Sequence, residues 1–297
     1  MTNGFNHITA ATLLICLSHS AQADINMMEA SFKTSFIDAQ VEGLKISRTY
    51  DSRSTYSGLF GFGWCSNLDV QLVRLSTAVV IRECGIERPA KVSFDKNSYL
   101  FKRSDGSTQR FAVEDGSLTG IQTPGHTEVP ILRQRGSERR KIFLELDELK
   151  RVRKITADGL ESDFVYGPDG TLRSAKNAWS NTYKYDYDRL HNLTRIFYPD
   201  NTTETLTYDT DHDRVTSFEG RNGCTETYRH TFQKIQTSKI LQTSVATLKC
   251  DFEAPQTETR FDFLFAKRSD QRWALSKLSL TREGKTQNIT YKLGGLP

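Results

Sequence analysis

The sequence predicts an all-β protein, an open antiparallel meander of β-hairpins preceded by a signal peptide. Three observations indicate this fold class. Aromatic residues recur about every twenty positions between residues 146 and 228, alternating polar and apolar residues surround them, and Pro, Asp, Asn and Gly gather between the alternating runs. One such unit is two strands and two turns. A single hairpin is unstable in water, so neighbouring units must bury its apolar face.

The first residues have the pattern of a secretory signal. Residues 8–17 are mostly apolar and uncharged, and residues 21–23 have the small-x-small pattern that signal peptidases cut, although no Lys or Arg precedes the apolar run. That run is too short to span a bilayer. We therefore expect residues 1–23 to be a signal peptide, and the mature chain to be exported to the periplasm or the extracellular space without a membrane span.

Residues 24–145 are expected to form an N-terminal β domain built around a glycine-rich aromatic segment. A predicted strand ends at Tyr50, and a turn rich in Arg and Ser follows it. Small glycines then let the backbone pack closely around large rings. We expect the rings to be core anchors; the segment comprises Tyr50, Arg53, Gly58, Phe60, Gly61, Phe62, Gly63 and Trp64.

Residues 146–230 carry the repeat. Tyr166, Tyr187, Tyr208 and Tyr228 are separated by 21, 21 and 20 residues, and Leu146 lies 20 residues further upstream. An apolar residue follows most anchors at a similar distance. The period is shorter than that of most helical repeats, and it lacks their 3.6-residue periodicity. We therefore expect a row of hairpins.

Within the repeat, tyrosines occupy every second position at Tyr183, Tyr185 and Tyr187. Alternate side chains of a strand point to one face, so these rings are expected to share a buried face with Leu206 and Tyr208. The acidic residues that follow two anchors, Asp188 and Asp209, are expected to accept hydrogen bonds from backbone amides at the start of each turn.

This pattern resembles the YD repeats of the Rhs family, which also occur in teneurins and in the shells of insecticidal toxin complexes. The segment from Tyr50 to Trp64 resembles the one that opens the repeat region in bacterial members. The resemblance covers about residues 24–230, although His191 and Asn201 stand where the repeat usually has Gly. It implies a YD-repeat meander. Family shells use a chain several times longer to enclose a cavity, so this one is expected to stay open.

Residues 231–297 lose the repeat but keep strand-like alternation, for example around Phe261, Phe263 and Phe265. We expect either degenerate repeats or a small capping β-sheet there. Toxin-bearing members of the family carry a self-cleavage segment and an effector after the repeats. Neither is recognisable in this sequence.

Four cysteines remain after the expected cleavage, and an even number in an exported protein favours disulfides. If residues 236–238 form a hairpin loop, Cys224 lies directly opposite Cys250, within disulfide reach. Cys65 and Cys84 flank another predicted hairpin that turns near residues 76–77, but they fall about four residues out of register. The alternative is four reduced, buried cysteines.

Catalytic motifs are absent from the sequence, and we expect no catalytic residue, metal or cofactor. His191 and His212, which lie one repeat apart at turn positions, are expected in solvated loops, and the recurring Asp residues are better explained by turns than by catalysis. The net charge of +4 gives no reason to expect nucleic-acid binding. Residues 133–154 hold nine Lys or Arg against four Asp or Glu, which is typical of a solvated strand face. A surface for an anionic glycan, lipid or partner is the alternative.

The function expected from these features is that of an exported, non-enzymatic, bacterial structural or interaction protein, an accessory or remnant of a polymorphic-toxin shell. Its partner would be another YD-repeat chain, paired through sheet edges, or a cell-surface glycan. Two alternatives stay open. One is a small secreted hydrolase or toxin with its site in residues 231–297, and the other is a glycan-binding β module with a row of exposed aromatic rings.

Overall fold

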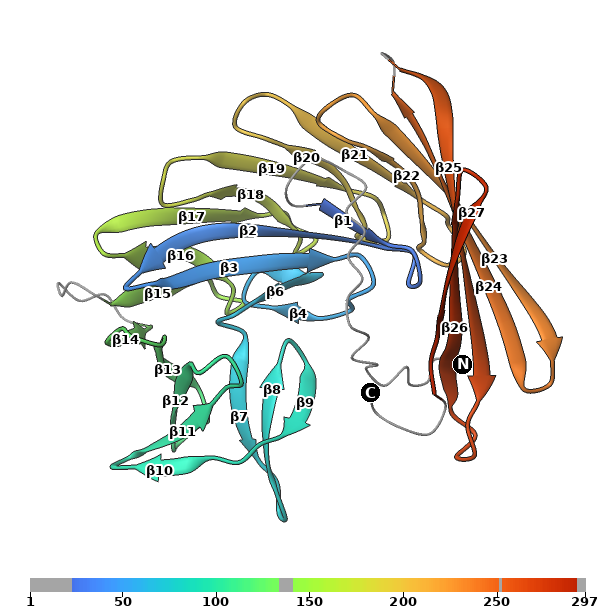
Figure 1. Cartoon of the computed structure of the whole chain (residues 1–297). Coiled ribbons are helices and arrows are strands. Elements are labelled where there is room, and N and C mark those ends of the chain that lie inside the picture. The colour runs from blue at the N-terminus through green and yellow to red at the C-terminus, as the bar shows by residue number, and fades with distance from the viewer. Residues whose placement is uncertain (1–22, 134–140, 251–252, 293–297) are drawn as a thin grey trace. The chain divides into compact units, whose positions relative to one another are not determined.

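The computed structural model describes residues 23–133, 141–250 and 253–292, with no account of the side chains of residues 23 and 253–255. These residues form strands and turns, and no helix occurs among them (Figure 1). The chain divides into two compact units, Lys33–Thr203 and the combination of Met1–Phe32 with Glu204–Pro297. We call them the large unit and the terminal unit. The predicted signal peptide lies outside the described residues, apart from Ala23.

The large unit begins with short sheets made by neighbouring strands. Strand β2 pairs with β3, and β3 pairs with β6; β4 pairs with β5, and β7, β8 and β9 form a three-stranded sheet. Their bounds are β2 Ser31–Val41, whose first two residues belong to the terminal unit, β3 Leu44–Asp51, β4 Ser57–Gly58, β5 Gly61–Phe62, β6 Trp64–Ser66, β7 Val70–Arg74, β8 Val79–Glu83 and β9 Ile86–Pro89.

The rest of the large unit is a meander in chain order. Each strand pairs with the next, and in Figure 1 strands β15 to β20 lie side by side. The bounds are β10 Ser93–Asp95, β11 Ser98–Lys102, β12 Thr108–Ala112, β13 Leu118–Gln122, β14 Glu128–Leu132, β15 Ile142–Leu146, β16 Val152–Ala157, β17 Leu160–Tyr166, β18 Leu172–Lys176, β19 Thr182–Tyr187 and β20 Leu193–Phe197.

One pairing departs from the antiparallel expectation. Strands β14 and β15 pair in parallel, with Ile131 opposite Ile142 and Leu132 opposite Phe143. Parallel neighbours need a crossover rather than a tight turn, and the residues that connect these two strands include 134–140, which lie outside the described part. From β15 to β20 each strand pairs antiparallel with the next.

The turns after β15, β17, β18, β19 and β20 share one geometry. In the turn after β19, the Asp188 N–H donates to the Asn192 carbonyl at 3.0 Å, and the His191 N–H donates to the Asp188 carbonyl at 3.2 Å. The fourth turn residue must be left-handed, which favours Gly. His191 (φ 67°) and Asn201 (φ 66°) adopt the same region as Gly170 (φ 82°). Residue types other than Gly therefore fit these turns.

The core of the large unit lies between the β2–β3–β6 sheet and the meander. Trp64 and Phe60 have no exposed surface, and Tyr185 is 1% exposed. The Trp64 ring lies 5.3 Å from the Tyr185 ring, and the Phe60 ring lies 5.0 Å from that of Phe164. The two sheets are thus joined by interlocking rings, which favour tilted and edge-on contacts of this kind.

The glycine-rich segment packs as tightly as expected, with one correction. A side chain at Gly63 (φ 78°) would lie 2.6 Å from the Tyr50 ring, and one at Gly61 (φ 85°) would lie 2.6 Å from the Gly170 carbonyl oxygen. Phe62, however, is only half-buried, and the centroid of its ring lies 5.4 Å from that of the His191 ring. The prediction that Phe62 is a core anchor was therefore wrong.

The terminal unit is built from longer strands. Its strands β21 to β27 pair antiparallel in chain order. Phe261, Phe263 and Phe265 point to one face and form an apolar cluster with Leu275. The bounds are β1 Ala23–Asn26, β21 Thr203–Tyr208, β22 Val215–Glu219, β23 Thr225–Gln236, β24 Lys239–Cys250, β25 Glu253–Lys267, β26 Trp273–Arg282 and β27 Lys285–Thr290.

Candidate functional sites

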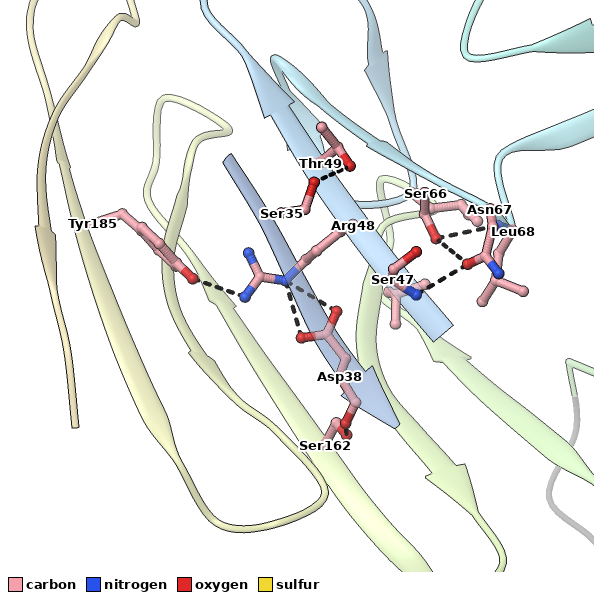
Figure 2. A network of polar contacts seen from close by, with 12 residues as sticks. Ser35, Asp38, Ser47, Arg48, Thr49, Ser66, Asn67, Leu68, Ser162 and Tyr185 are labelled. Atoms are coloured by element: carbon pink, nitrogen blue, oxygen red, sulfur yellow. Dashed lines mark hydrogen bonds and ion pairs between the residues drawn. The ribbon is translucent and has the colours of Figure 1, made fainter. Parts of the chain in front are cut away.

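The most concentrated polar network of the large unit surrounds Arg48. This residue occupies an inward position of β3, between Ile46 and Tyr50, and its side chain has no exposed surface. Its Nε donates to Asp38 Oδ1 at 3.1 Å and lies 3.0 Å from Oδ2, and its Nη2 donates to the Tyr185 hydroxyl at 2.7 Å (Figure 2). Strands β2, β3 and β19 are thereby tied together at one point.

Aromatic rings enclose the same guanidinium. Its central carbon lies 4.6 Å from the Trp64 ring centroid, 4.8 Å from that of Phe36 and 5.3 Å from that of Tyr185. A desolvated cation over such rings gains about 2 kcal/mol or more from their quadrupoles. The rings therefore supply part of the stabilisation that water supplies to an exposed arginine.

Asp38 completes the network as its counter-ion. Burial raises the pKa of its carboxyl to about 6, and the charge and hydrogen bond of Arg48 oppose that rise. The Ser162 hydroxyl also donates to the Asp38 backbone carbonyl at 2.8 Å, which connects β2 to β17. Because the ion pair is inaccessible to solvent, it cannot meet a substrate, and its role is to hold the two layers in register.

A second polar cluster surrounds Asp69. Its Oδ1 accepts hydrogen bonds from the Tyr56 hydroxyl (2.9 Å) and the Leu59 N–H (2.8 Å), and its Oδ2 accepts from the Ser66 N–H (2.9 Å). Burial raises the pKa of Asp69 to about 6, and these three donors oppose the rise. The carboxylate thus fixes the connection between β3 and β7 from three sides.

A pocket of about 250 Å³ opens beside Asp69. Two of its polar lining residues are already paired: the Arg82 Nε donates to Glu87 at 3.0 Å, and the Gln71 amide donates to the Asp115 carbonyl at 3.1 Å. Its walls are formed by Tyr56, Leu59, Leu68, Asp69, Val70, Gln71, Arg82, Cys84, Gly85, Asp115, Ser117 and Arg133.

The two acidic residues of the repeat bind backbone amides. Asp188 Oδ1 accepts from the N–H groups of Leu190 (2.8 Å) and Asn192 (2.9 Å), and Asp209 Oδ1 accepts from the His212 N–H (2.6 Å). These contacts satisfy turn amides that have no strand partner.

The recurring tyrosines mostly use their hydroxyls as internal hydrogen-bond partners. In the large unit, the Tyr50 hydroxyl accepts from the Leu193 N–H at 3.0 Å, the Tyr187 hydroxyl accepts from Trp64 Nε1 at 3.0 Å, and the Tyr166 hydroxyl donates to the Val152 carbonyl at 2.6 Å. In the terminal unit, the Tyr228 hydroxyl donates to Glu226 at 2.7 Å. The side chain of Tyr208 is half-buried, whereas the sequence predicted a buried position for it.

Two further predicted motif residues flank the glycine-rich segment. Arg53 is exposed, and its backbone N–H donates to Asp51 at 2.9 Å. Gly58 pairs with Gly61 in the β4–β5 ladder and borders the Asp69 cluster, because a side chain there would clash with Asp69 Oδ1 and the Tyr56 ring.

Both disulfides are present. Cys224 and Cys250 have α-carbons 4.2 Å apart, and the predicted register holds, with Tyr228 opposite Ala246. The loop differs from the prediction, because Gln236 pairs with Lys239 and only residues 237–238 turn, with a bulge between Lys234 and Gln236.

The Cys65–Cys84 disulfide joins α-carbons 5.5 Å apart. The predicted hairpin exists, with Arg74 opposite Val79. The four-residue offset is resolved because Cys65 belongs to β6, whose chain turns at residues 66–69 before β7 begins. That turn brings Cys65 beside the end of β8.

Residues 23–133, 141–250 and 253–292 contain no candidate for a metal site or for a membrane-spanning helix. No group of three or more His, Cys, Asp or Glu residues is placed there to hold a metal ion. No helix in that part of the chain could cross a bilayer. The exposed aromatics of the large unit, Phe94 and Trp179, lie on separate hairpins.

Comparisons with known proteins give two similarities. Residues 29–89 match the family model described as "Domain of unknown function (DUF6531)". Among solved structures, the chain is similar to one titled "Crystal Structure of TcdB2-TccC3-Cdc42", with 13% identity and a TM-score of 0.26, over 88% of this chain and 14% of that one. No curated protein matches.

Proposed function

We propose that this chain is an exported, non-enzymatic, Rhs-like YD-repeat protein that acts through structural or protein contacts, as an accessory or remnant of a polymorphic-toxin shell. The observation that carries the proposal is that reactive side chains are occupied in building the fold. Asp188 binds turn amides, Asp69 is saturated by three donors, and Arg48 and Asp38 neutralise each other out of reach of solvent.

Two findings support the family and the compartment. The matched family model covers residues 29–89, which include the Tyr50–Trp64 segment on which the Rhs resemblance depends. The two disulfides fit an oxidising compartment, because cytosolic reductants keep thiols reduced. The partner we propose is another protein chain that uses the open strand edges of the meander, with a cell-surface glycan as the other class.

The experiment is a turnover screen of purified residues 24–297 on peptide, ester, glycan and nucleic-acid substrates. We expect no turnover of any of them. The carboxylate to substitute in the C-terminal third is Asp262, which accepts hydrogen bonds from Arg260 and Thr243. Partial burial acts to raise the pKa of Asp262, but these hydrogen bonds outweigh it, so the pKa is lowered. If the protein reproducibly hydrolyses a substrate, and Asp262→Ala loses this activity while keeping the melting temperature of the parent, the hypothesis of a structural protein is replaced by that of a secreted hydrolase.

A further inference from the structure

The terminal unit exposes an unpaired strand edge at the far half of β23. Strand β22 pairs with β23 only at Thr225, Glu226 and Thr227, whereas β24 follows β23 along its whole length. In Figure 1 the β23–β24 hairpin continues well past the end of β22. Each residue of 231–238 is exposed, and the contacts beside this edge come from the start of β22, where the Val215 carbonyl oxygen lies 3.3 Å from His230 Nε2 and the Arg214 guanidinium packs on the Phe232 ring.

The backbone groups that face this edge follow from the hairpin geometry. The Gly220 N–H donates to the Cys224 carbonyl at 2.9 Å, so even-numbered residues of β23 direct their N–H and C=O toward β22. Beyond Tyr228 these groups belong to His230, Phe232 and Lys234, beside which no strand of the described residues lies. The bulge between Lys234 and Gln236 limits regular pairing to residues 229–234.

The side chains along the edge give it a chemical preference. Residues 229–249 contain four Lys or Arg and no Asp or Glu. Arg229 and Lys234 are exposed on the edge strand itself, and the Arg214 guanidinium lies 4.4 Å from the half-exposed Phe232 ring. Glu258 lies 3.8 Å from Arg229, but both side chains are more than half exposed, so the pair is weak.

We propose that residues 229–234 bind, by strand addition, an extended segment of a partner protein in which acidic and apolar residues alternate. The main-chain groups of His230 and Phe232 would supply the ladder, and the Phe232 ring would pack against an apolar side chain on its face of the sheet. Arg229, which projects from the opposite face, would attract the carboxylates, and Lys234 at the end of the Phe232 face adds positive charge to the edge. A second copy of this chain is disfavoured, because it would bring the same basic side chains together. This inference deepens the proposed interaction function and rests on it.

The test uses a fluorescent peptide of alternating Glu and Val, and a matched peptide of alternating Lys and Val. We expect anisotropy to show binding of the acidic peptide at low salt and weaker binding at high salt, because the charges are exposed. Hydrogen exchange should show protection of the His230 and Phe232 amides. In the double variant Arg229→Glu, Lys234→Glu, the acidic peptide should bind about tenfold less tightly and the basic peptide more tightly.

The matched control is Arg282→Glu, Lys285→Glu, an exposed basic pair on β26 and β27 that changes the net charge by the same amount. It should leave binding unchanged. Phe232→Pro removes an edge N–H and should also abolish binding, with circular dichroism checking that the sheet persists. Equal weakening in both double variants, protection at another edge, self-association of the free protein through this edge, or no binding of the acidic peptide would each overturn the proposal. The turnover screen is unaffected by these outcomes.

Discussion

Separating the Arg48–Asp38 pair tests whether it holds the large unit together. Asp38→Val leaves a cation with no counter-ion, and Arg48→Met leaves a carboxylate; each should lower the free energy of unfolding by about 3–5 kcal/mol. The double variant keeps an apolar interior of similar volume. It should cost only about 1–3 kcal/mol, the penalty for the Tyr185 hydroxyl that loses its donor.

Urea denaturation at pH 7 would measure these differences, with the pair Arg153 and Glu145 as control. Those side chains are 2.8 Å apart but 62% and 26% exposed, so removing their pairing should cost below about 1 kcal/mol. If the Asp38 and Arg48 substitutions are additive, so that the double variant loses the sum of the two decreases in the free energy of unfolding, the proposed role of the Arg48–Asp38 pair is refuted. Loss of the cooperative transition in both single variants with its recovery in the double variant would support it.

The pH dependence gives an independent check on the same pair. The folded pKa of Asp38 is about 6, above the unfolded value of about 3.9, so protonation favours the folded state. Its contribution to stability is therefore present at low pH and is lost as pH rises through 6. In Arg48→Met the folded pKa should rise further, and the variant should lose up to about 1.4 kcal/mol per pH unit between pH 6 and 8. A flat profile for Arg48→Met would contradict this.

Three further predictions concern other parts of the fold. Trp64→Ala should lower the free energy of unfolding by about 3–5 kcal/mol because the ring is fully buried, and Phe62→Ala, at a half-buried site, should cost clearly less; equal melting curves for Trp64→Ala and the parent would contradict this. Cys224→Ser should cost roughly 3 kcal/mol in chemical denaturation, and peptide mapping without reductant should find no free thiol in the parent. Asp188→Ala should cost about 1–3 kcal/mol, and Asp188→Asn less, whereas the exposed Asp186→Ala should stay within about 0.5 kcal/mol.

Periodic features were predictable from the sequence because they depend on local rules. The spacing of Tyr166 and Tyr187 requires two strands and two turns in each unit, and this is what β17 to β20 are. The Cys224–Cys250 register followed from counting along one hairpin. The pairing of Cys65 with Cys84 could not be obtained by counting along one hairpin, because a turn at residues 66–69 moves the chain from one sheet to another. No local pattern encodes that change.

The buried network was less visible in the sequence. In the run from Leu44 to Tyr50, alternate residues face inward, so an inward position at Arg48 was the available signal. Its partners could not be found by spacing, because Tyr185 is 137 residues away and meets Arg48 only when the two layers pack. The prediction that Phe62 is a core anchor was wrong for a related reason: alternation predicts which face of the strand a side chain takes, but not whether another layer covers that face.

The turn residues show why recurrence favours structure over catalysis. Asp147 Oδ1 accepts from the N–H groups of Leu149 and Arg151, both at 2.9 Å. Asn177 stands at the equivalent place in the turn after β18 and accepts from Trp179 (3.1 Å) and Asn181 (3.0 Å) through the same atom. Since a neutral amide performs the task as well as a carboxylate, the task needs an oxygen acceptor and not an acid. A general acid or base depends on its titration, whereas this turn contact depends only on an oxygen acceptor.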